Sequence, residues 1–184
     1  MADLKKLTRE LAEMPEGSIA LVETGEEMLG QVGLISIKSL TDSGFSVLLL
    51  SASRPYQNLS SIYKAKGVDL SRLYCIDCIS KSHDSGVQDS DNVRYLANVS
   101  DLTEMLLAIN GFLSRMKGKK FMFIDSVSTM LIYNRPDTLA KFIHITLTKL
   151  RLSGTSAVLI AVDGQTNKEV RAEIVQLCDS VIKV

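Results

Sequence analysis

The sequence predicts an α/β protein in which helices cover both faces of a mostly parallel central sheet, giving a three-layer α/β/α fold. Two observations support this fold class. Short apolar runs, such as residues 47–50 and 157–162, are almost uninterrupted, which is typical of strands buried on both faces. Segments with apolar residues at helical spacing alternate with these runs along the chain. Because crossovers between parallel strands are right-handed, this alternation builds helical layers on both sides of one sheet.

The first half of the chain alternates three strand signals with two helix signals. Gly44 and Gly67 follow the two helical patterns, and glycine is a common stop residue because it readily adopts the left-handed conformation at a helix end. Pro55 favours the first turn of the second helix. In chain order, we predict a strand at 18–23, a helix at 27–43, a strand at 46–51, a helix from 55 to about 66 and a strand at 72–77.

The second half continues the alternation after a polar stretch. Residues 80–92 carry no element signal, and we predict a loop there. Asp101 is a suitable N-cap for a helix whose apolar residues recur every three or four positions. In chain order, we predict a short strand at 93–96, that helix from 102 to about 116, a strand at 121–125, a helix at 136–152, a strand at 156–162, a helix at 167–178 and a strand at 179–184.

Length and composition indicate a folded protein with a sizeable core. The chain has 184 residues, of which 46% are apolar, so it is long enough for one domain and too apolar for disorder. We divide it into an N-terminal helical segment, residues 1–16, and a core domain, residues 17–184. The spacing of Leu4, Leu7 and Leu11 predicts the helix in the first segment.

Charge and hydropathy exclude several classes of protein. The formal net charge is zero, whereas general nucleic-acid and anionic-membrane binders carry a basic excess. The apolar runs are too short to span a bilayer, and the N-terminus has no secretory apolar region. We therefore expect a cytoplasmic protein that binds neither nucleic acid nor membrane.

The cysteines, histidines and acidic loop residues give weak signals for a metal site. Cys75 and Cys78 form a C-x-x-C at the end of a predicted strand, where residues three apart point to opposite faces. A second such pair is absent and Cys178 is distant in the sequence, so buried structural thiols are favoured over a zinc or redox site. The spacing of His83 and His144 matches no catalytic motif. We therefore predict no metal site. The loop carboxylates lack the turn glycine and terminal glutamate of a calcium loop; they are Asp84, Asp89 and Asp91.

The turn after the first predicted strand has the spacing of a phosphate-binding loop. In the pattern G-x-x-x-x-G-K-[ST], the lysine contacts the β- and γ-phosphates and the hydroxyl binds Mg²⁺. Gly25 and Gly30 stand at the two glycine positions, but Gln31 replaces the lysine and Val32 replaces the serine or threonine. Neither replacement can do the chemistry of the residue that the pattern requires.

Two carboxylates lie inside the same turn. Glu26 and Glu27 occupy positions that would face the phosphates, and like charges at about 4 Å repel by about 1 kcal/mol in water and about 4 kcal/mol at an intermediate dielectric. The turn is therefore interpreted as a nucleotide-binding loop that has lost its nucleotide. An ordinary strand-to-helix turn, with glycines for tight geometry, is the alternative.

With this order of elements, the chain resembles the RecA-like P-loop ATPases, and within them the KaiC/RadA-type cores. The resemblance covers residues from about 17 to 184. Besides the turn, it rests on the second strand and its helix with the ending Gly67-Val68-Asp69, on the run at 121–124 followed by Asp125 and Ser126, and on the last strands at 157–162 and 178–182.

The resemblance implies a fold without its catalytic groups. In KaiC-type proteins the second strand commonly runs into paired glutamates that activate the attacking water, and the matching positions here hold Ala52 and Ser53. Neither can act as a general base. Asp125, followed by Ser126, matches the Walker B position that helps hold Mg²⁺ in the family. The alternative role for Asp125 is to cap the turn after its strand.

The resemblance also bears on DNA binding and assembly. The DNA-contacting loops of recombinase relatives would correspond to residues 126–135 and 163–168. These segments are short here and carry one basic residue each, so we expect no DNA-binding surface.

Relatives often dock an N-terminal segment onto a neighbouring subunit, and many carry further strands after the one at 179–184. The helix at 136–152 has Ile145 and Leu152 off its main apolar stripe; burial under neighbouring loops and a subunit contact both remain open.

These observations lead to a non-catalytic KaiC-like pseudo-ATPase that serves as a scaffold, a regulator or a protein-interaction module. We expect no catalytic residue and weak or absent binding of ATP and Mg²⁺. The expected partner is another protein, either a second copy in a homo-oligomer or an active RecA/KaiC-like paralogue. A weak nucleotide-responsive binding module is the first alternative, and an enzyme of another kind on the same fold is the second.

Overall fold

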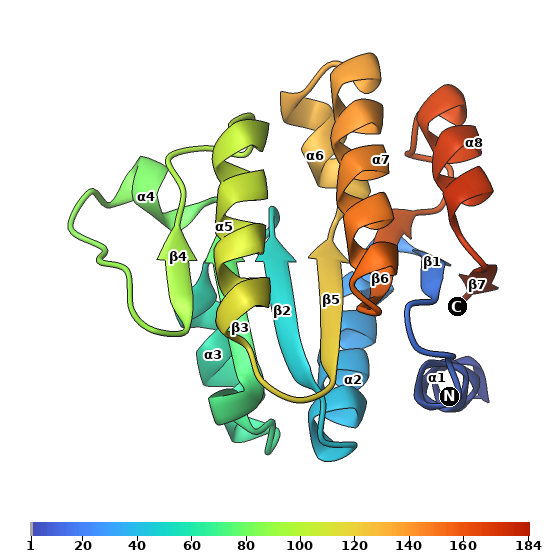
Figure 1. Ribbon diagram of the computed structural model, residues 1–184, viewed down its shortest axis with the longest axis horizontal. Coiled ribbons are helices and arrows are strands. Elements are labelled where there is room, and N and C mark those ends of the chain that lie inside the picture. The colour runs from blue at the N-terminus through green and yellow to red at the C-terminus, as the bar shows by residue number, and fades with distance from the viewer. Residues whose placement is uncertain (1) are drawn as a thin grey trace.

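Within residues 2–184, which the computed structural model of the protein describes, seven parallel strands form one central sheet (Figure 1). Their order across the sheet is β4-β3-β2-β5-β6-β1-β7. The predicted parallel α/β architecture is confirmed, and all seven predicted strands agree with the observed bounds within one residue at each end. The strands are β1 (Ile19–Thr24), β2 (Ser46–Ser51), β3 (Leu73–Asp77), β4 (Val93–Tyr95), β5 (Lys120–Asp125), β6 (Ser156–Val162) and β7 (Ser180–Lys183).

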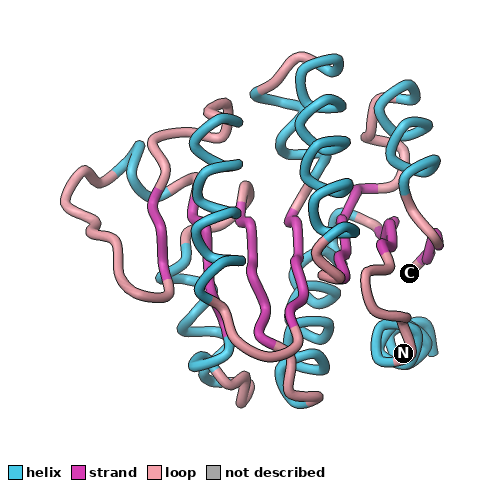
Figure 2. Tube along the Cα trace, viewed as in Figure 1, coloured by secondary structure: helices cyan, strands magenta, loops and turns pink. Residues whose placement is uncertain are grey.

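Helices cover both faces of the sheet (Figures 1 and 2). Side chains alternate between faces along each strand, so Leu48 and Leu50 of β2 enter one apolar cluster while Val47 and Leu49 enter the other. One face packs with α1 (Ala2–Ala12), α2 (Leu29–Asp42) and α3 (Tyr56–Ala65), and the other with α5 (Leu102–Arg115), α6 (Val127–Tyr133), α7 (Pro136–Leu152) and α8 (Lys168–Leu177).

The parallel register brings the carboxyl ends of the strands to one edge of the sheet. Ser51 at the end of β2 pairs with Asp77 of β3 on one side and with Asp125 of β5 on the other. Thr24 ends β1 and pairs with Val162 of β6 at the same edge. Open parallel sheets bind ligands beyond these carboxyl ends, so this edge is where a functional site is sought.

The expected loop at 80–92 is wrong at its start, because Ser80–His83 form a short helix, α4. Asp77, which is fully buried, accepts hydrogen bonds from the N–H groups of Ile79 and Ser80, both at 2.8 Å. Its second carboxylate oxygen accepts the Ser80 hydroxyl at 2.6 Å and the N–H of Tyr56, at the start of α3, at 2.7 Å. A carboxylate at the end of β3 therefore starts the helix, and the composition of the loop does not reveal it.

The segment 126–135, expected to be a short loop, contains helix α6. Ser126 is its N-cap, since its hydroxyl accepts the N–H of Thr129 at 3.2 Å. The alternative in which Asp125 caps the following turn is therefore wrong, because the adjacent serine does so. The Ser128 hydroxyl also accepts the N–H of Val162 at 2.9 Å, which ties α6 to the end of β6.

The apolar stripe of the N-terminal segment packs on the chain's own core. Leu4, Leu7 and Leu11 are 6%, 0% and 1% exposed and join the cluster that contains Val32 and Leu40 of α2. Each buried leucine stabilises the fold by about 1.5–3 kcal/mol. The stripe is therefore covered within the chain and is not a free docking face for a neighbouring subunit. Met1, the first residue of this segment, lies outside the described residues.

Candidate functional site

The turn between β1 and α2 closes on itself through backbone hydrogen bonds. Gly25 is extended, with φ −65° and ψ 152°, and Glu26–Met28 form one 3₁₀ turn, η1. The N–H of Met28 donates to the carbonyl of Gly25 at 3.0 Å, and the N–H of Leu29 donates to the carbonyl of Glu26. A phosphate-binding loop directs such N–H groups at the anion. Here these two are already paired inside the turn.

The carboxylates of the turn lie at the N-terminal end of the helix. The Oε1 atom of Glu27 is 2.5 Å from the position that a Cβ atom at Gly25 would occupy, so Glu27 folds over the glycine. The Glu26 carboxylate accepts a hydrogen bond from Gln165 at 3.2 Å. Negative charge is favourable at a helix N-terminus. The turn thus carries two carboxylates of its own at the N-terminal end of α2.

Arg54, which follows β2, provides a cation against the first turn of α2. Its Nη1 atom is 2.5 Å from the position that a Cβ atom at residue 30 would occupy, so the guanidinium lies directly against the backbone of Gly30. Arg54 is half-buried, and within residues 2–184 no carboxylate forms an ion pair with it. A guanidinium without an acidic partner is a potential donor to a ligand.

Asp125 lies at the end of β5 and is 6% exposed. Burial raises the pKa of its carboxyl group, and the charge of Arg54 acts in the opposite direction. Among the described residues, its Oδ1 atom has no hydrogen-bond partner, and the same holds for the buried hydroxyl of Thr24 at the end of β1. Buried polar atoms normally find partners, so this edge of the sheet holds two exceptions.

The predicted site residues fall into two groups. Gln31 is exposed at the start of α2 and Ser53 is half-buried. Val32 and Ala52, in contrast, are fully buried in the two apolar clusters on opposite faces of the sheet. These two positions therefore serve packing and do not face a ligand.

The structure brings Arg54 and Gly30 into contact and places the charge of Arg54 near Asp125. Arg54 was missed by the sequence reasoning, which concentrated on the glutamates absent from the preceding two positions. The sequence does distinguish Arg54, because it is the single basic residue between the second strand and its helix, next to Pro55.

The C-x-x-C cysteines are buried side chains. Cys75 and Cys78 are 0% and 1% exposed, and burial raises the pKa of both thiols above its ordinary value. Cys178 is half-buried, and burial raises its pKa to about 12. Metal binding and redox chemistry need the thiolate, so these positions favour structural thiols. In the described part of the chain, no group of three or more His, Cys, Asp or Glu side chains is placed to hold a metal ion.

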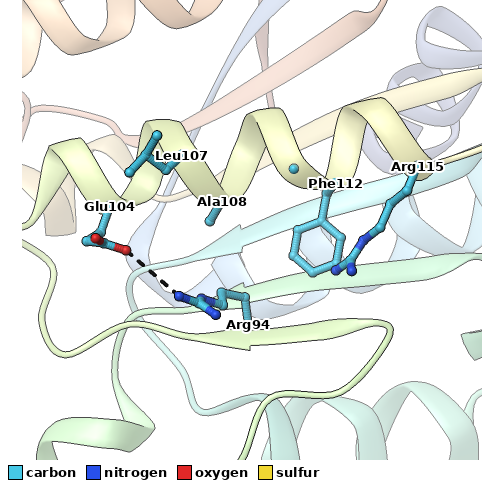
Figure 3. Close-up of a pocket in the computed structure, with 7 residues that line it drawn as sticks. Arg94, Glu104, Leu107, Ala108, Phe112 and Arg115 are labelled. Atoms are coloured by element: carbon cyan, nitrogen blue, oxygen red, sulfur yellow. Dashed lines mark ion pairs between the residues drawn. The ribbon is translucent and has the colours of Figure 1, made fainter.

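A separate hollow lies at the opposite side of the sheet, between edge strand β4 and α5 (Figure 3). Its volume is about 390 Å³. Arg94 forms an ion pair with Glu104 at 3.9 Å, and Arg115 lies 4.3 Å from the centre of the Phe112 ring. Four strands separate β4 from β1 in the sheet, so this hollow is not part of the site at the turn.

Throughout residues 2–184, no helix has the length and apolar character needed to cross a bilayer.

Comparison with protein families identifies one family that matches most of the chain. Residues 29–184 match a family that is described as a family of unknown function, DUF7090. The chain belongs to this family. The match begins at the first residue of α2. A search of curated proteins found no match to this DUF7090 protein.

Several solved structures with the same fold come from archaea. The flagellar accessory protein FlaH from Methanocaldococcus jannaschii is 12% identical, with a TM-score of 0.63 over 97% of this chain and 76% of FlaH. A KaiC-like protein from Pyrococcus horikoshii is 14% identical, with a TM-score of 0.65 over 92% of this chain and 72% of that protein.

An uncharacterized Pyrococcus horikoshii protein in complex with an unknown peptide is 20% identical, with a TM-score of 0.65 over 97% of this chain and 82% of its own. At these identities the likeness shows the fold alone. The resemblance to KaiC-like proteins is therefore confirmed for the fold of the DUF7090 protein.

Proposed function

We propose that this DUF7090 protein is a non-catalytic KaiC-like module that acts through contacts with other proteins. The observation that carries the proposal is the occupation of the turn after β1 by the chain's own charges. The Glu27 carboxylate lies over Gly25 and the Arg54 guanidinium lies over Gly30. A triphosphate in this turn would meet the repulsion of the two glutamates.

The missing chemical groups support the same conclusion. Gln31 carries no charge for the phosphates, and the side chain of Val32 is part of the core. Asp125 is therefore the one residue of the catalytic set that remains at its position, and that carboxylate by itself does not organise Mg²⁺ and a triphosphate. Ala52 and Ser53 offer no general base for water.

A role in protein contacts agrees with the descriptions of two proteins of similar fold. One of the Pyrococcus horikoshii proteins was crystallised with a peptide, and FlaH is described as an accessory protein. For the DUF7090 protein, we propose a protein partner, either a second copy of the chain or an active KaiC-like paralogue.

Calorimetric titration with ATP and Mg²⁺, together with a phosphate-release assay, tests the loss of nucleotide chemistry. We expect no binding tighter than about 1 mM and no turnover above the buffer. Micromolar affinity together with ATP hydrolysis by the unmodified protein would contradict the proposal.

A weak nucleotide-responsive binding module is the second candidate, and the unpartnered polar atoms favour it. Arg54 can donate hydrogen bonds, while Asp125 and Thr24 present buried oxygen atoms without partners. A neutral, adenosine-like ligand with both donors and acceptors suits this set better than a polyanion does. Ligands that bind the folded state stabilise it by about 2.7 kcal/mol at a hundred times Kd.

Thermal denaturation with adenosine and with ADP tests this candidate. An increase in Tm that Arg54→Ala abolishes and Arg135→Ala preserves would support it. An unchanged Tm with both ligands at millimolar concentration, about the weakest binding of interest, would reject it and leave the protein-contact function in place.

A further inference from the structure

Helix α7 carries an outward stripe that its own chain leaves uncovered. Ile145 is 53% exposed and Leu152 is 86% exposed, and Thr148, also exposed, lies between them. The spacings of three and four residues place all three on one side of the helix. Burial under neighbouring loops, one of the two readings left open by the sequence, is therefore wrong for residues 2–184.

The surroundings of this stripe are basic. Lys141 and Lys149 lie on the same side of α7 and are exposed, and neither forms an ion pair in the described part of the chain. The one carboxylate of α7, Asp137, is in the first turn and pairs with Arg135 at 3.4 Å. The exposed stripe is therefore apolar with uncompensated positive charge at its margins.

The stripe lies between two shallow hollows. A hollow of about 310 Å³ separates it from α8 and is lined by Thr148, Leu152 and Leu177, among others. A second, of about 170 Å³, lies toward α5 and is lined by Leu113 and Lys149, among others. Figure 1 shows α5, α7 and α8 on the same face of the sheet. A ridge with a groove on each side is the surface into which another helix packs.

We propose that this face of α7 is the docking surface for an acidic amphipathic helix of a partner protein. The partner's apolar residues would cover Ile145 and Leu152, and its carboxylates would face Lys141 and Lys149. The charges argue against a second copy of α7, because it would bring the same cations to the contact without a carboxylate opposite them. They also argue against an anionic bilayer, since recognition of such a surface uses clusters of about four to eight basic residues.

This inference rests on the proposed role in protein contacts, but it does not depend on the turn after β1. A finding that the protein binds nucleotide would contradict the loss of nucleotide chemistry and leave the α7 face untouched. Conversely, failure of the docking test would leave the nucleotide result unaffected. The two proposals therefore fail separately.

A synthetic helix serves as the probe. We would use a fluorescein-labelled peptide of about four heptads with Leu at positions a and d and Glu at positions e and g, whose own charges oppose self-association. Fluorescence anisotropy with the full chain is expected to give saturable binding with Kd of about 10–100 µM, which is the range of a small, transient interface. Binding is expected to weaken as the salt concentration rises.

Variants assign the contact to α7. Ile145→Glu and Leu152→Glu should each weaken binding at least about tenfold, since each places a carboxylate against the peptide's glutamates. Ile62→Glu is the matched control, because Ile62 is 39% exposed on α3, in the opposite helical layer. Circular dichroism melting verifies folding, and Leu152→Ser provides a milder variant should a glutamate unfold the chain.

Four outcomes would overturn the proposal. The first is equal binding of a peptide with Lys in place of Glu, and the second is binding that Ile145→Glu and Leu152→Glu leave unchanged. The third is binding to phosphatidylglycerol-containing vesicles without binding to the peptide. The fourth is a dimer, measured by light scattering, that Ile145→Glu dissociates, since this would identify a second copy as the occupant.

Discussion

Replacement of Asp77 by alanine is expected to lower the free energy of unfolding by about 4 kcal/mol. The carboxylate is fully buried and accepts four hydrogen bonds, from Tyr56, Ile79 and twice from Ser80, at 2.6–2.8 Å. Alanine would leave these donors without an acceptor at the starts of both α3 and α4. Each unpaired buried donor costs about 1–3 kcal/mol, and these costs do not simply add. The expected loss of unfolding free energy is therefore large.

Urea unfolding at neutral pH, followed by circular dichroism, measures this loss. Asp77→Asn is the informative companion, since it keeps one oxygen acceptor and the shape of the side chain, and it should lose about half as much. Asp84→Ala is the control, because Asp84 is an exposed aspartate a few residues further along the chain. A loss below about 1 kcal/mol for Asp77→Ala would show that the carboxylate does not hold these two helix starts.

Replacement of Arg171 by methionine is expected to cost about 2–3 kcal/mol. Glu23 at the end of β1 is 3% exposed, and Arg171 of α8 contacts both of its carboxylate oxygens, one of them at 2.9 Å. Breaking a fully buried ion pair costs about 3–5 kcal/mol because a charge is left without its partner. The expected value is lower here, since Arg171 is 41% exposed and Lys183 remains 3.7 Å from Glu23.

The same ion pair predicts a dependence of stability on pH. The hydrogen bond from Arg171 lowers the pKa of Glu23 below its ordinary value of 4.5. The folded state therefore binds this proton less readily than the unfolded state does, so the stabilisation is fully present above about pH 4.5 and is lost as the pH falls through the folded pKa. Unfolding free energies measured between pH 7 and pH 3 should show the difference between the unmodified protein and Arg171→Met shrinking with acidification.

An exposed arginine gives the control for this comparison. Arg135 is 83% exposed in its pair with Asp137, so Arg135→Met should change the unfolding free energy by less than about 0.5 kcal/mol at any pH. A difference for Arg171→Met that stays constant from pH 7 to pH 3 would assign the effect to lost packing of the arginine stem instead of to the charge of Glu23.

The alternation of apolar runs and amphipathic segments was sufficient to predict the architecture. The strands at 46–51 and 156–162 and the helix at 136–152 have the predicted bounds. These elements are buried on two faces or along a stripe, so burial imposes a period on the sequence that can be counted. The short elements α4 and α6 carry no such period. Their first turns are held by Asp77 and Ser126, whose hydrogen bonds depend on where the preceding strand ends.

The sequence by itself also determined which residues stand at the positions of the phosphate-loop pattern, because glycine spacing and residue identity at Gln31 can be read directly. The tertiary structure alone decided what occupies the site. Arg54 reaches Gly30 from another strand, and Val32 turns into the core. The direction of a side chain depends on the phase of its helix and on the strand beside it, and these are settled only when the layers pack together.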